Sequence, residues 1–364
     1  MRIGVPTEIK PSERRIGMTP DGVHAVVDAG HEVFVQDGAG TGAGFGNAEY
    51  LAAGAQLGTQ EEVWEKAELL VKVKEPIESE YSFLREDLTV FTYLHLAADR
   101  ALTESLLKNR TRAIAYETVR EGRSLPLLTP MSEIAGRLAA QAAAQYSLHT
   151  EGGAGILLGG TPGVTPARVV ILGGGMVGTQ AALLAVGLRA EVTILDAYLP
   201  RVRELTDYFG NSARVIASNP RNIERELEQA DVVIGSVLVP GAAAPKLVRR
   251  EHLKLLKPGS LLIDVAIDQG GCFETSHPTT YDDPVFEVDG IRHYCVANMP
   301  GAVPRTATAS LTNATLPFIL QLAQGIDDAL ERSAALAAGL NTDAGEIVFR
   351  GVADAFPDLP ARRG

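Results

Sequence analysis

The chain has 364 residues, of which 46% are hydrophobic and 21% charged, a composition typical of about two globular domains. The formal net charge of -12 argues against a nucleic acid or an anionic membrane as partner, because both are bound through basic patches. Cys272 and Cys295 are too few for a disulfide framework and form no C-x-x-C pair, so we expect both to be buried as small apolar residues.

The N-terminal segment begins with a strand-like run and lacks the apolar core and small-residue cleavage site of a signal peptide. No window approaches about 18 uninterrupted apolar residues, the length that would span a membrane. These features predict a cytoplasmic protein without a membrane segment.

Short apolar runs alternate with helical patterns through the first third of the chain. This alternation predicts a parallel, doubly wound sheet. The expected strands are Arg2–Pro6, Glu32–Gln36, Leu69–Lys74, Leu88–Tyr93 and Ala113–Thr118, and the expected helices between them are Asp21–Ala29, Gln60–Lys66 and Arg100–Leu107.

Glycines cluster at Gly38–Gly46, after the second expected strand. The spacing formally fits a nucleotide-binding turn, but the following helix would be short and no acid ends a next strand on schedule. We therefore expect a mobile surface loop there rather than a second nucleotide site.

Titratable residues follow the expected strands of this region, where ligands of open α/β sheets bind. Arg15 lies in the loop after the first strand and could bind a carboxylate through two parallel hydrogen bonds. Lys74 and His95 end two further strands, and an imidazole can give and take a proton within one cycle. Lys72 has the same parity as Lys74, so at most one of the two is expected to function. Glu117 ends the next strand and is expected to position Lys74 or a water.

A dinucleotide-binding fingerprint lies in the middle of the chain. An Ala-rich helix, Glu133–His149 with Ser132 as N-cap, precedes it, and the strand Arg168–Leu172 leads into Gly173-Gly-Gly175-Met-Val-Gly178. The first glycine permits the tight turn, the second lets the backbone approach a pyrophosphate, and the third lets the helix pack on its strand.

Asp196 ends the next apolar run, close to the roughly 20 residues past the first glycine expected of a ribose-binding acid. A carboxylate there accepts hydrogen bonds from a 2′-hydroxyl and repels a 2′-phosphate, which favours NAD over NADP. Arg201 argues in the opposite direction, since an arginine nearby can accommodate that phosphate.

A second series of strands follows the fingerprint, and the pattern turns helical from about Ala307 to Gly339. Asp268 follows the strand Leu261–Val265 and leads into a glycine loop that could face a nicotinamide. The remaining expected strands are Val192–Leu195, Val215–Ala217, Val232–Gly235 and His293–Ala297. The fold class predicted is therefore α/β, with two doubly wound Rossmann-like domains and a cleft between them. The cofactor domain, 131–305, is expected to be inserted into a substrate domain made of 1–130 and 306–364.

At these motifs the chain resembles alanine dehydrogenase, in the family that also contains the NAD-binding subunit of proton-translocating transhydrogenase. The resemblance covers nearly the whole chain. The segments that carry it include Val5–Lys10, Val71–Pro76, Tyr93–Ala98, Ala115–Thr118, Pro130–Arg137, Pro240–Ala242, Ala244–Val248, Asp264–Phe273 and Val296–Pro300.

The resemblance implies NAD-dependent, reversible oxidative deamination of L-alanine to pyruvate and ammonium by a homohexamer. It implies that His95 and Asp268 are the acid/base pair and that Arg15, Lys74 and Asn298 bind substrate, with Glu117 and Tyr93 in support. The cofactor contacts that the fingerprint and the resemblance give are Ser132, Gly173, Gly175, Met176, Val177, Gly178, Asp196, Arg201, Ser218, Val237, Leu238, Val265, Ala266, Ile267, Asp268, Val296, Ala297, Asn298 and Met299.

Two positions depart from the family pattern. His277 stands where some members have an arginine that contacts the cofactor, and residues 320–325 lack the acid and histidine with which some members bind magnesium. We therefore expect no metal there. The alternative function is a non-catalytic NAD-binding protein, or one like the transhydrogenase subunit.

Overall fold

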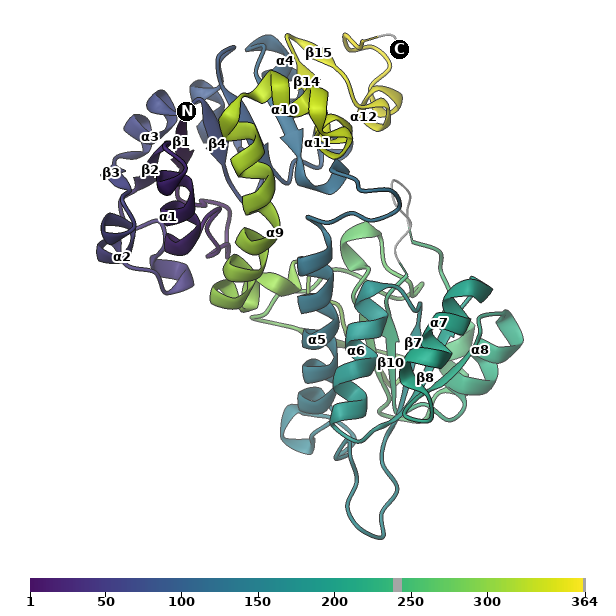
Figure 1. Cartoon of the computed structure of the whole chain (residues 1–364). Helices are drawn as coiled ribbons and strands as arrows, with labels where there is room; N and C mark the ends of the chain where they lie inside the picture. The colour runs from purple at the N-terminus through teal and green to yellow at the C-terminus, as the bar shows by residue number, and fades with distance from the viewer. Residues whose placement is uncertain (238–243, 363–364) are drawn as a thin grey trace. The chain divides into compact units, whose positions relative to one another are not determined.

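The computed structural model describes residues 1–237 and 244–362 and divides into two compact units (Figure 1). Unit 1 combines the two ends of the chain, Met1–Met131 and Gly301–Gly364, and unit 2 is the continuous segment Ser132–Pro300. Each unit contains one mostly parallel sheet covered by helices, as the alternating pattern predicts, so the two Rossmann-like domains are confirmed.

The sheet of unit 1 has eight strands within the described residues, in the order β15-β14-β6-β5-β4-β1-β2-β3. The strands from β6 to β3 run parallel, and β14 and β15 extend the sheet antiparallel beside β6. Their bounds are β1 Arg2–Val5, β2 Glu32–Gln36, β3 Gln56–Gly58, β4 Leu69–Val71, β5 Thr89–Thr92, β6 Arg112–Ala115, β14 Leu340–Asp343 and β15 Glu346–Ile347.

The helices of unit 1 begin at strong N-terminal signals. The Thr19 hydroxyl accepts from the Gly22 amide to cap α1, whose first residue is Pro20. Thr59 and Glu62 form a capping box at α3. The helices are α1 Pro20–Asp28, α2 Asn47–Ala52, α3 Gln60–Lys66, α4 Arg100–Lys108, α9 Pro304–Gln324, α10 Ile326–Arg332, α11 Ala334–Gly339 and α12 Arg350–Ala355.

The sheet of unit 2 has seven strands in the described part of the chain, in the order β12-β13-β11-β10-β7-β8-β9. All neighbours are parallel except β12 and β13. The strands are β7 Arg168–Leu172, β8 Glu191–Asp196, β9 Arg214–Ala217, β10 Val232–Gly235, β11 Leu261–Asp264, β12 Val285–Val288 and β13 Ile291–Tyr294; the helices are α5 Thr129–Tyr146, α6 Met176–Gly187, α7 Leu199–Phe209 and α8 Pro220–Leu227.

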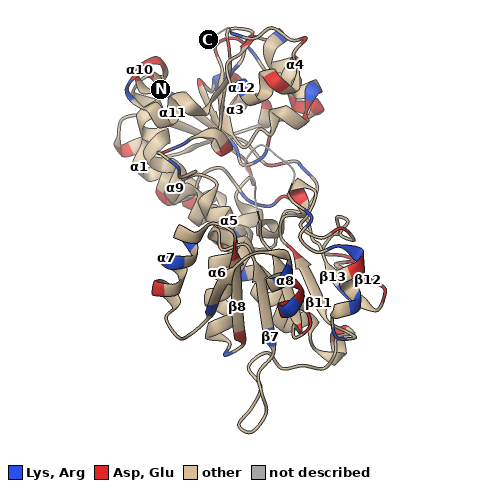
Figure 2. Cartoon of the chain, turned by 90° about the vertical axis from the view of Figure 1, so that its right-hand side faces the viewer, with Lys and Arg blue, Asp and Glu red and all other residues tan. Residues whose placement is uncertain are grey.

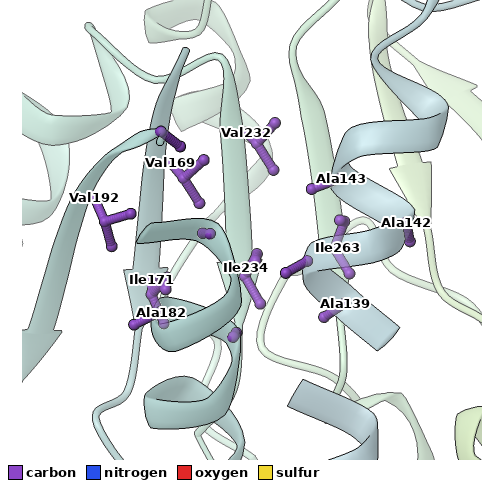
Figure 3. Packing of buried hydrophobic residues seen from close by; sticks show 14 of the residues in the cluster. Ala139, Ala142, Ala143, Val169, Ile171, Ala182, Val192, Val232, Ile234 and Ile263 are labelled. Carbon is purple, nitrogen blue, oxygen red and sulfur yellow. The ribbon is translucent and has the colours of Figure 1, made fainter. Parts of the chain in front are cut away.

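Side chains of β7 alternate between two cores, as expected of a strand buried on both faces. Val169 and Ile171 pack toward α5, α6 and α7, whereas Val170 and Leu172 pack toward α8. Figure 3 shows the first of these cores, in which alanines of α5 and α6 lie over Val169, Ile171 and Ile234. In Figure 2 the strands β7 and β8 are mostly uncharged, in keeping with that burial.

Small residues bring α5 and α6 together. A Cβ on Gly136 of α5 would lie 2.2 Å from the carbonyl oxygen of Val177 in α6, so a larger residue would force the helices apart. The two helices lie side by side in Figure 1.

Both sheets reverse their winding at one point. In unit 1 the chain leaves β1 for β2 and β3 on one side and for β4, β5 and β6 on the other, and in unit 2 the reversal lies between β7 and β10. Loops that leave the two strands at such a point separate and form a crevice where ligands bind.

Several expected element bounds were wrong. Ser132 lies inside α5, which begins at Thr129 and ends at Tyr146, so it is not an N-cap. β4 ends at Val71 because the Val73 amide donates to the Glu8 carboxylate instead of to the sheet. Strand β6 ends at Ala115, and the short 3-10 helix η4, Tyr116–Thr118, follows it.

Other differences concern the C-terminal third. Strand β13 is Ile291–Tyr294, earlier than the expected His293–Ala297, and the expected long helix is broken into α9, α10 and α11. The first break falls at Gly325, whose φ of 151° is outside the helical range.

The glycine cluster at 38–46 lies largely at the surface, as expected, but Ala39, Gly40 and Ala43 within it are buried. Ala43 is 1% exposed, and the Arg305 guanidinium donates to the Gly44 carbonyl. A Cβ on Gly42 would lie 2.9 Å from the carbonyl oxygen of Arg14, so this segment supports the chain next to Arg15.

Candidate active site

Arg15 is held by Glu13 in the loop after β1. The two side chains form a buried ion pair in which Nε and Nη2 of Arg15 donate to the two carboxylate oxygens of Glu13. The Arg15 amide also donates to Glu13 Oε1 at 3.0 Å. Burial alone would raise the pKa of Glu13, but the hydrogen bonds and charge of Arg15 outweigh it and lower that pKa. This pairing fixes one edge of the guanidinium, while Nη1 lies 3.0 Å from the Met131 sulfur.

The backbone after Arg15 lies directly on the end of β4. A Cβ on Gly17 would be 2.5 Å from the carbonyl oxygen of Val71, so only glycine permits this approach. Because β1 and β4 flank the point of reversal in unit 1, Arg15 and Lys74 both follow strands at the place where α/β sheets commonly bind ligands.

Lys74 is a largely buried lysine with an altered proton affinity. Burial and then the positive charge of Arg15 lower its pKa from the ordinary value of 10.5. Its backbone is fixed at both ends, since the Lys74 amide donates to Glu8 Oε2 at 3.3 Å and its carbonyl accepts from the Thr92 hydroxyl at 3.0 Å. Lys72, by contrast, is 1% exposed and pairs with Glu80 at 2.9 Å and Glu8 at 3.5 Å.

His95 lies in an unusual backbone conformation just beyond β5. Its φ and ψ are 50° and 33°, in the left-handed region that non-glycine residues rarely adopt. Within unit 1 the imidazole is exposed and stacks on Tyr93, with the planes 10° apart. The Tyr93 hydroxyl donates to the Leu127 carbonyl at 2.5 Å, which fixes the ring beneath the imidazole.

Glu117 holds the backbone of His95. Its carboxylate accepts from the His95 amide at 2.7 Å and from the Leu94 amide at 3.2 Å. The structure thus shows Glu117 in contact with the His95 turn, and its positioning of Lys74 or a water stays a prediction.

The fingerprint forms a tight cradle at the end of β7. Gly173 has a φ of 103°, and a Cβ on Gly178 would lie 1.9 Å from the Gly173 carbonyl oxygen. Nothing lies within 4 Å of a Cβ on Gly175, which stands at the N-terminus of α6. The cradle therefore excludes side chains where the loop meets its helix and leaves backbone open at the helix start, where phosphates bind.

Asp196 and Arg201 both bind the fingerprint loop. Asp196 Oδ2 accepts from the Gly174 amide at 2.8 Å, and Arg201 Nε donates to the Gly174 carbonyl at 2.8 Å. Arg201 also donates to Glu204 and to the Thr179 hydroxyl, each at 2.8 Å. All three nitrogens of the Arg201 guanidinium thus have partners in the fingerprint loop, in α6 or in Glu204.

Asp268 and Asn298 are adjacent in unit 2. Asp268 lies in the short 3-10 helix η7, Ile267–Gln269, and its Oδ2 accepts from the Asn298 amide at 3.3 Å. Asn298 has a φ of 53°, a second left-handed non-glycine residue at a candidate position.

The other expected cofactor residues lie mostly at the carboxyl ends of the unit 2 strands. The Ser218 amide donates to the Asp196 carbonyl, and Val237 is next to Gly173. Met176 and Val177 begin α6, and Ser132 lies in the first turns of α5. Leu238 lies outside the described residues. The rest follow β11 or β13: Val265, Ala266, Ile267, Val296, Ala297 and Met299.

Comparisons with known proteins agree along the whole chain. Family models described as Alanine dehydrogenase/PNT, N-terminal domain and C-terminal domain, match residues 4–135 and 139–350. Alanine dehydrogenase 2 of Staphylococcus aureus (strain USA300) is 52% identical over 98% of this chain and 96% of its own length. Alanine dehydrogenase of Halomonas elongata is 53% identical over 98% of this chain and 97% of its own length.

The chain belongs to the alanine dehydrogenase/PNT family. A solved L-alanine dehydrogenase superposes with a TM-score of 0.96 at 51% identity, covering 98% of this chain and 99% of that one. A transhydrogenase from Sinorhizobium meliloti superposes with a TM-score of 0.84 at 25% identity, covering 95% and 100%.

The sequence did not identify four acidic residues whose contacts hold parts of the candidate site: Glu8, Glu13, Glu80 and Asp264. Glu8, Glu13 and Glu80 bind cations and amides around Arg15 and Lys74. Asp264 is 1% exposed and accepts from the Cys272 and Phe273 amides and the Ser276 hydroxyl, which fixes the loop after Asp268. Only Glu13, two residues before Arg15, carried a sequence signal, as an acid paired with a nearby arginine.

His277 stacks on Phe286 with ring centroids 3.6 Å apart. Within the ranges 1–237 and 244–362, no group of three or more His, Cys, Asp or Glu residues has a geometry suited to a metal ion. Over the same ranges, no helix has the length and apolar character needed to cross a membrane.

Proposed function

We propose that this chain catalyses the NAD-dependent, reversible oxidative deamination of L-alanine to pyruvate and ammonium, the activity for which its relatives are named. One observation carries the proposal: the chain combines the glycine cradle of the fingerprint in unit 2 with two cationic residues in unit 1. These residues, Arg15 and Lys74, follow the strands that flank the reversal point of the unit 1 sheet. The proposed substrate domain is 1–130 with 306–364, and the proposed NAD domain is 131–305.

NAD fits the residues of unit 2. Gly173 and Gly178 keep the turn clear of side chains, and the first amides of α6 are available to a pyrophosphate. Asp196 offers a carboxylate for the ribose hydroxyls, and Arg201 is engaged by Gly174, Thr179 and Glu204. When bound, NAD supplies the hydride acceptor at its nicotinamide.

We propose that Arg15 and Lys74 bind the substrate carboxylate. Glu13 orients the Arg15 guanidinium through Nε and Nη2, and the positive charges of Arg15 and Lys74 are the groups proposed to attract the anion. Two cations on one carboxylate orient Cα, and such orientation supplies much of the rate of a hydride transfer.

We propose that His95 and Asp268 carry the protons of the reaction. In deamination, a base removes a proton from the water that attacks the imine carbon, and an acid protonates the departing amine. In the reverse direction a protonated His95 would polarise the pyruvate carbonyl. Asn298, bonded to Asp268 through its backbone, is proposed to bind the substrate beside it.

The proposal is tested by assaying NADH formation from L-alanine and NADH oxidation by pyruvate plus ammonium, with glycine, serine and lysine as competing substrates. We expect L-alanine to give the highest kcat/KM. Preference for lysine, or the absence of turnover in both directions while NADH still binds, would contradict it. The latter result would favour a non-catalytic NAD-binding protein or one like the transhydrogenase subunit, to which the 25% identical structure points.

We also propose a homohexamer located in the cytoplasm. Light scattering on the purified protein should then give six times the chain mass of 38.6 kDa. A stable mass of one or two chains would contradict the hexamer.

A further inference from the structure

Two carboxylates of unit 1 hold the ends of two neighbouring strands in the same way. Glu117 follows β6 and accepts from the Leu94 and His95 amides beyond β5. Glu8 follows β1 and accepts from the Val73 amide at 2.6 Å and the Lys74 amide at 3.3 Å beyond β4. In the sheet order β6-β5-β4-β1, each outer strand supplies the acid that binds the inner strand beside it.

These amides are the ones that the sheet no longer binds. β4 and β5 end at Val71 and Thr92, and the amides of the buried residues Val73 and Leu94 beyond them need another acceptor. A carboxylate is a strong acceptor that can bind two successive amides at once. Each pair of amides therefore includes the backbone amide of one candidate residue, which is His95 for Glu117 and Lys74 for Glu8.

The His95 turn depends on this contact because its backbone is strained. A left-handed histidine persists only where surrounding contacts determine it, and the His95 amide makes the shortest of the Glu117 bonds, 2.7 Å. The exposed imidazole is placed by this backbone and by the Tyr93 ring beneath it.

The Glu8 carboxylate is itself held by a buried lysine. Lys72 lies 3.5 Å from Glu8 and 2.9 Å from Glu80, and all three side chains are buried. Glu80 also accepts from the Ile77 amide at 3.0 Å. The buried lysine thus binds both acids and keeps Glu8 beneath the Lys74 backbone.

We propose that Glu117 and Glu8 are positioning residues with separate tasks: Glu117 places His95 for proton transfer, and Glu8 places Lys74 for carboxylate binding. The inference rests on the proposed function, in which His95 acts on turnover and Lys74 on substrate affinity. Loss of the first contact should therefore lower kcat, and loss of the second should raise the pyruvate KM.

The test measures kcat, pyruvate KM and NADH affinity for paired variants. Glu117→Ala should lower kcat about tenfold to a hundredfold with little change in the pyruvate KM, because a small misplacement of a catalytic group has effects of that size. Glu8→Gln should raise the pyruvate KM about tenfold, with a smaller effect on kcat. NADH affinity should stay at the wild-type value in both, since the fingerprint lies in unit 2.

The glutamine variants separate positioning from charge. Glu117 Oε1 accepts from both Leu94 and His95, and Oε2 is a second acceptor for the Leu94 amide only, so Glu117→Gln can keep Oε1 on both amides and should recover most of the lost kcat. Glu8 uses one oxygen for each amide, and its glutamine variant loses one acceptor. Should Glu117→Ala not fold, Glu117→Asp replaces it, because a carboxylate one methylene shorter should lose kcat in the same way.

Wild-type kcat in Glu117→Ala or Glu117→Asp, an equal effect of both acids on kcat and KM, or no recovery in Glu117→Gln would overturn the inference. His95→Ala and Lys74→Ala serve as references. If these two lose turnover and affinity while the acid variants do not, the inference alone fails. If His95→Ala keeps wild-type turnover, the proposed role of His95 fails instead.

Discussion

Lys74 is a candidate residue whose environment changes its proton affinity. Its burial and the neighbouring Arg15 charge lower its pKa, so the ammonium loses its proton at a lower pH than an exposed lysine, whose ordinary pKa is 10.5. Only the charged form attracts a carboxylate. We expect the Kd of pyruvate for the NADH-bound protein to begin rising below pH 10.5, measured by fluorescence titration.

Lys74→Arg is the control for this pH dependence. A guanidinium stays charged throughout the range, so the alkaline rise in the pyruvate Kd should be lost even if the affinity itself is weaker. The same alkaline rise in Lys74→Arg and the wild type would show that another group titrates.

Asp196 is the residue expected to set the cofactor preference. Its carboxylate would repel a 2′-phosphate, so Asp196→Ala should shift the ratio of kcat/KM for NAD over NADP by about tenfold or more, equivalent to about 1.4 kcal/mol. NAD affinity should also fall, since the Gly174 amide loses its acceptor. Glu204→Gln, which alters only an exposed partner of Arg201, should leave the ratio unchanged; an unchanged ratio in Asp196→Ala would remove Asp196 from ribose recognition.

It could be predicted that Arg15, Lys74 and His95 follow the strands β1, β4 and β5, because chain order and parallel pairing bring the carboxyl ends of those strands to one edge. Glu13 lies only two residues from its partner Arg15, but the roles of Glu8 and Glu117 could not be predicted. Their partners are backbone amides and buried side chains brought near only by tertiary structure, and an acid in a loop has no pattern that identifies such a partner.

At the level of elements, α6 carries a matched pair of glycines. Gly178→Ala would press a methyl group against the Gly173 carbonyl oxygen, whereas a Cβ on Gly187 meets nothing within 4 Å. We expect Gly178→Ala to abolish or severely weaken NADH binding. Gly187→Ala should keep binding and raise the free energy of unfolding by up to about 1 kcal/mol, the helix preference for alanine. Calorimetric titration measures the NADH affinity, and denaturant unfolding measures the free energy of unfolding. Tight NADH binding by Gly178→Ala would contradict the proposed role of the glycine cradle in cofactor binding.

The long periodic elements followed from the sequence with small errors in bounds, as α3 shows at Gln60–Lys66. The strands β3, β12, β14 and β15 were not predicted. They are two to four residues long and lie at or next to sheet edges, where a short segment pairs because of its neighbour rather than its own pattern. The end of β4 was also missed, since a carboxylate distant in sequence ends it.

At the level of the whole molecule, the two units should respond differently to cofactor. NADH at a hundred times its Kd stabilises the state that binds it by about 2.7 kcal/mol. We expect slower amide hydrogen exchange in β7, α6 and β8 of unit 2, with β2 and α2 of unit 1 as the internal reference. Protection confined to unit 1 would contradict the proposed location of the cofactor site.

The discontinuity of unit 1 has a consequence for biosynthesis. Unit 2 is a single segment, so its sheet is complete once residue 300 has left the ribosome. Strand β6 of unit 1 gains its antiparallel neighbour β14 only with residues 340–343, more than 200 positions later. During that interval β6 is an open sheet edge, and such edges are prone to pair with other chains. The nascent protein therefore passes through a stage in which the unit proposed to bind NAD can be folded while the unit proposed to bind substrate still exposes an unpaired strand.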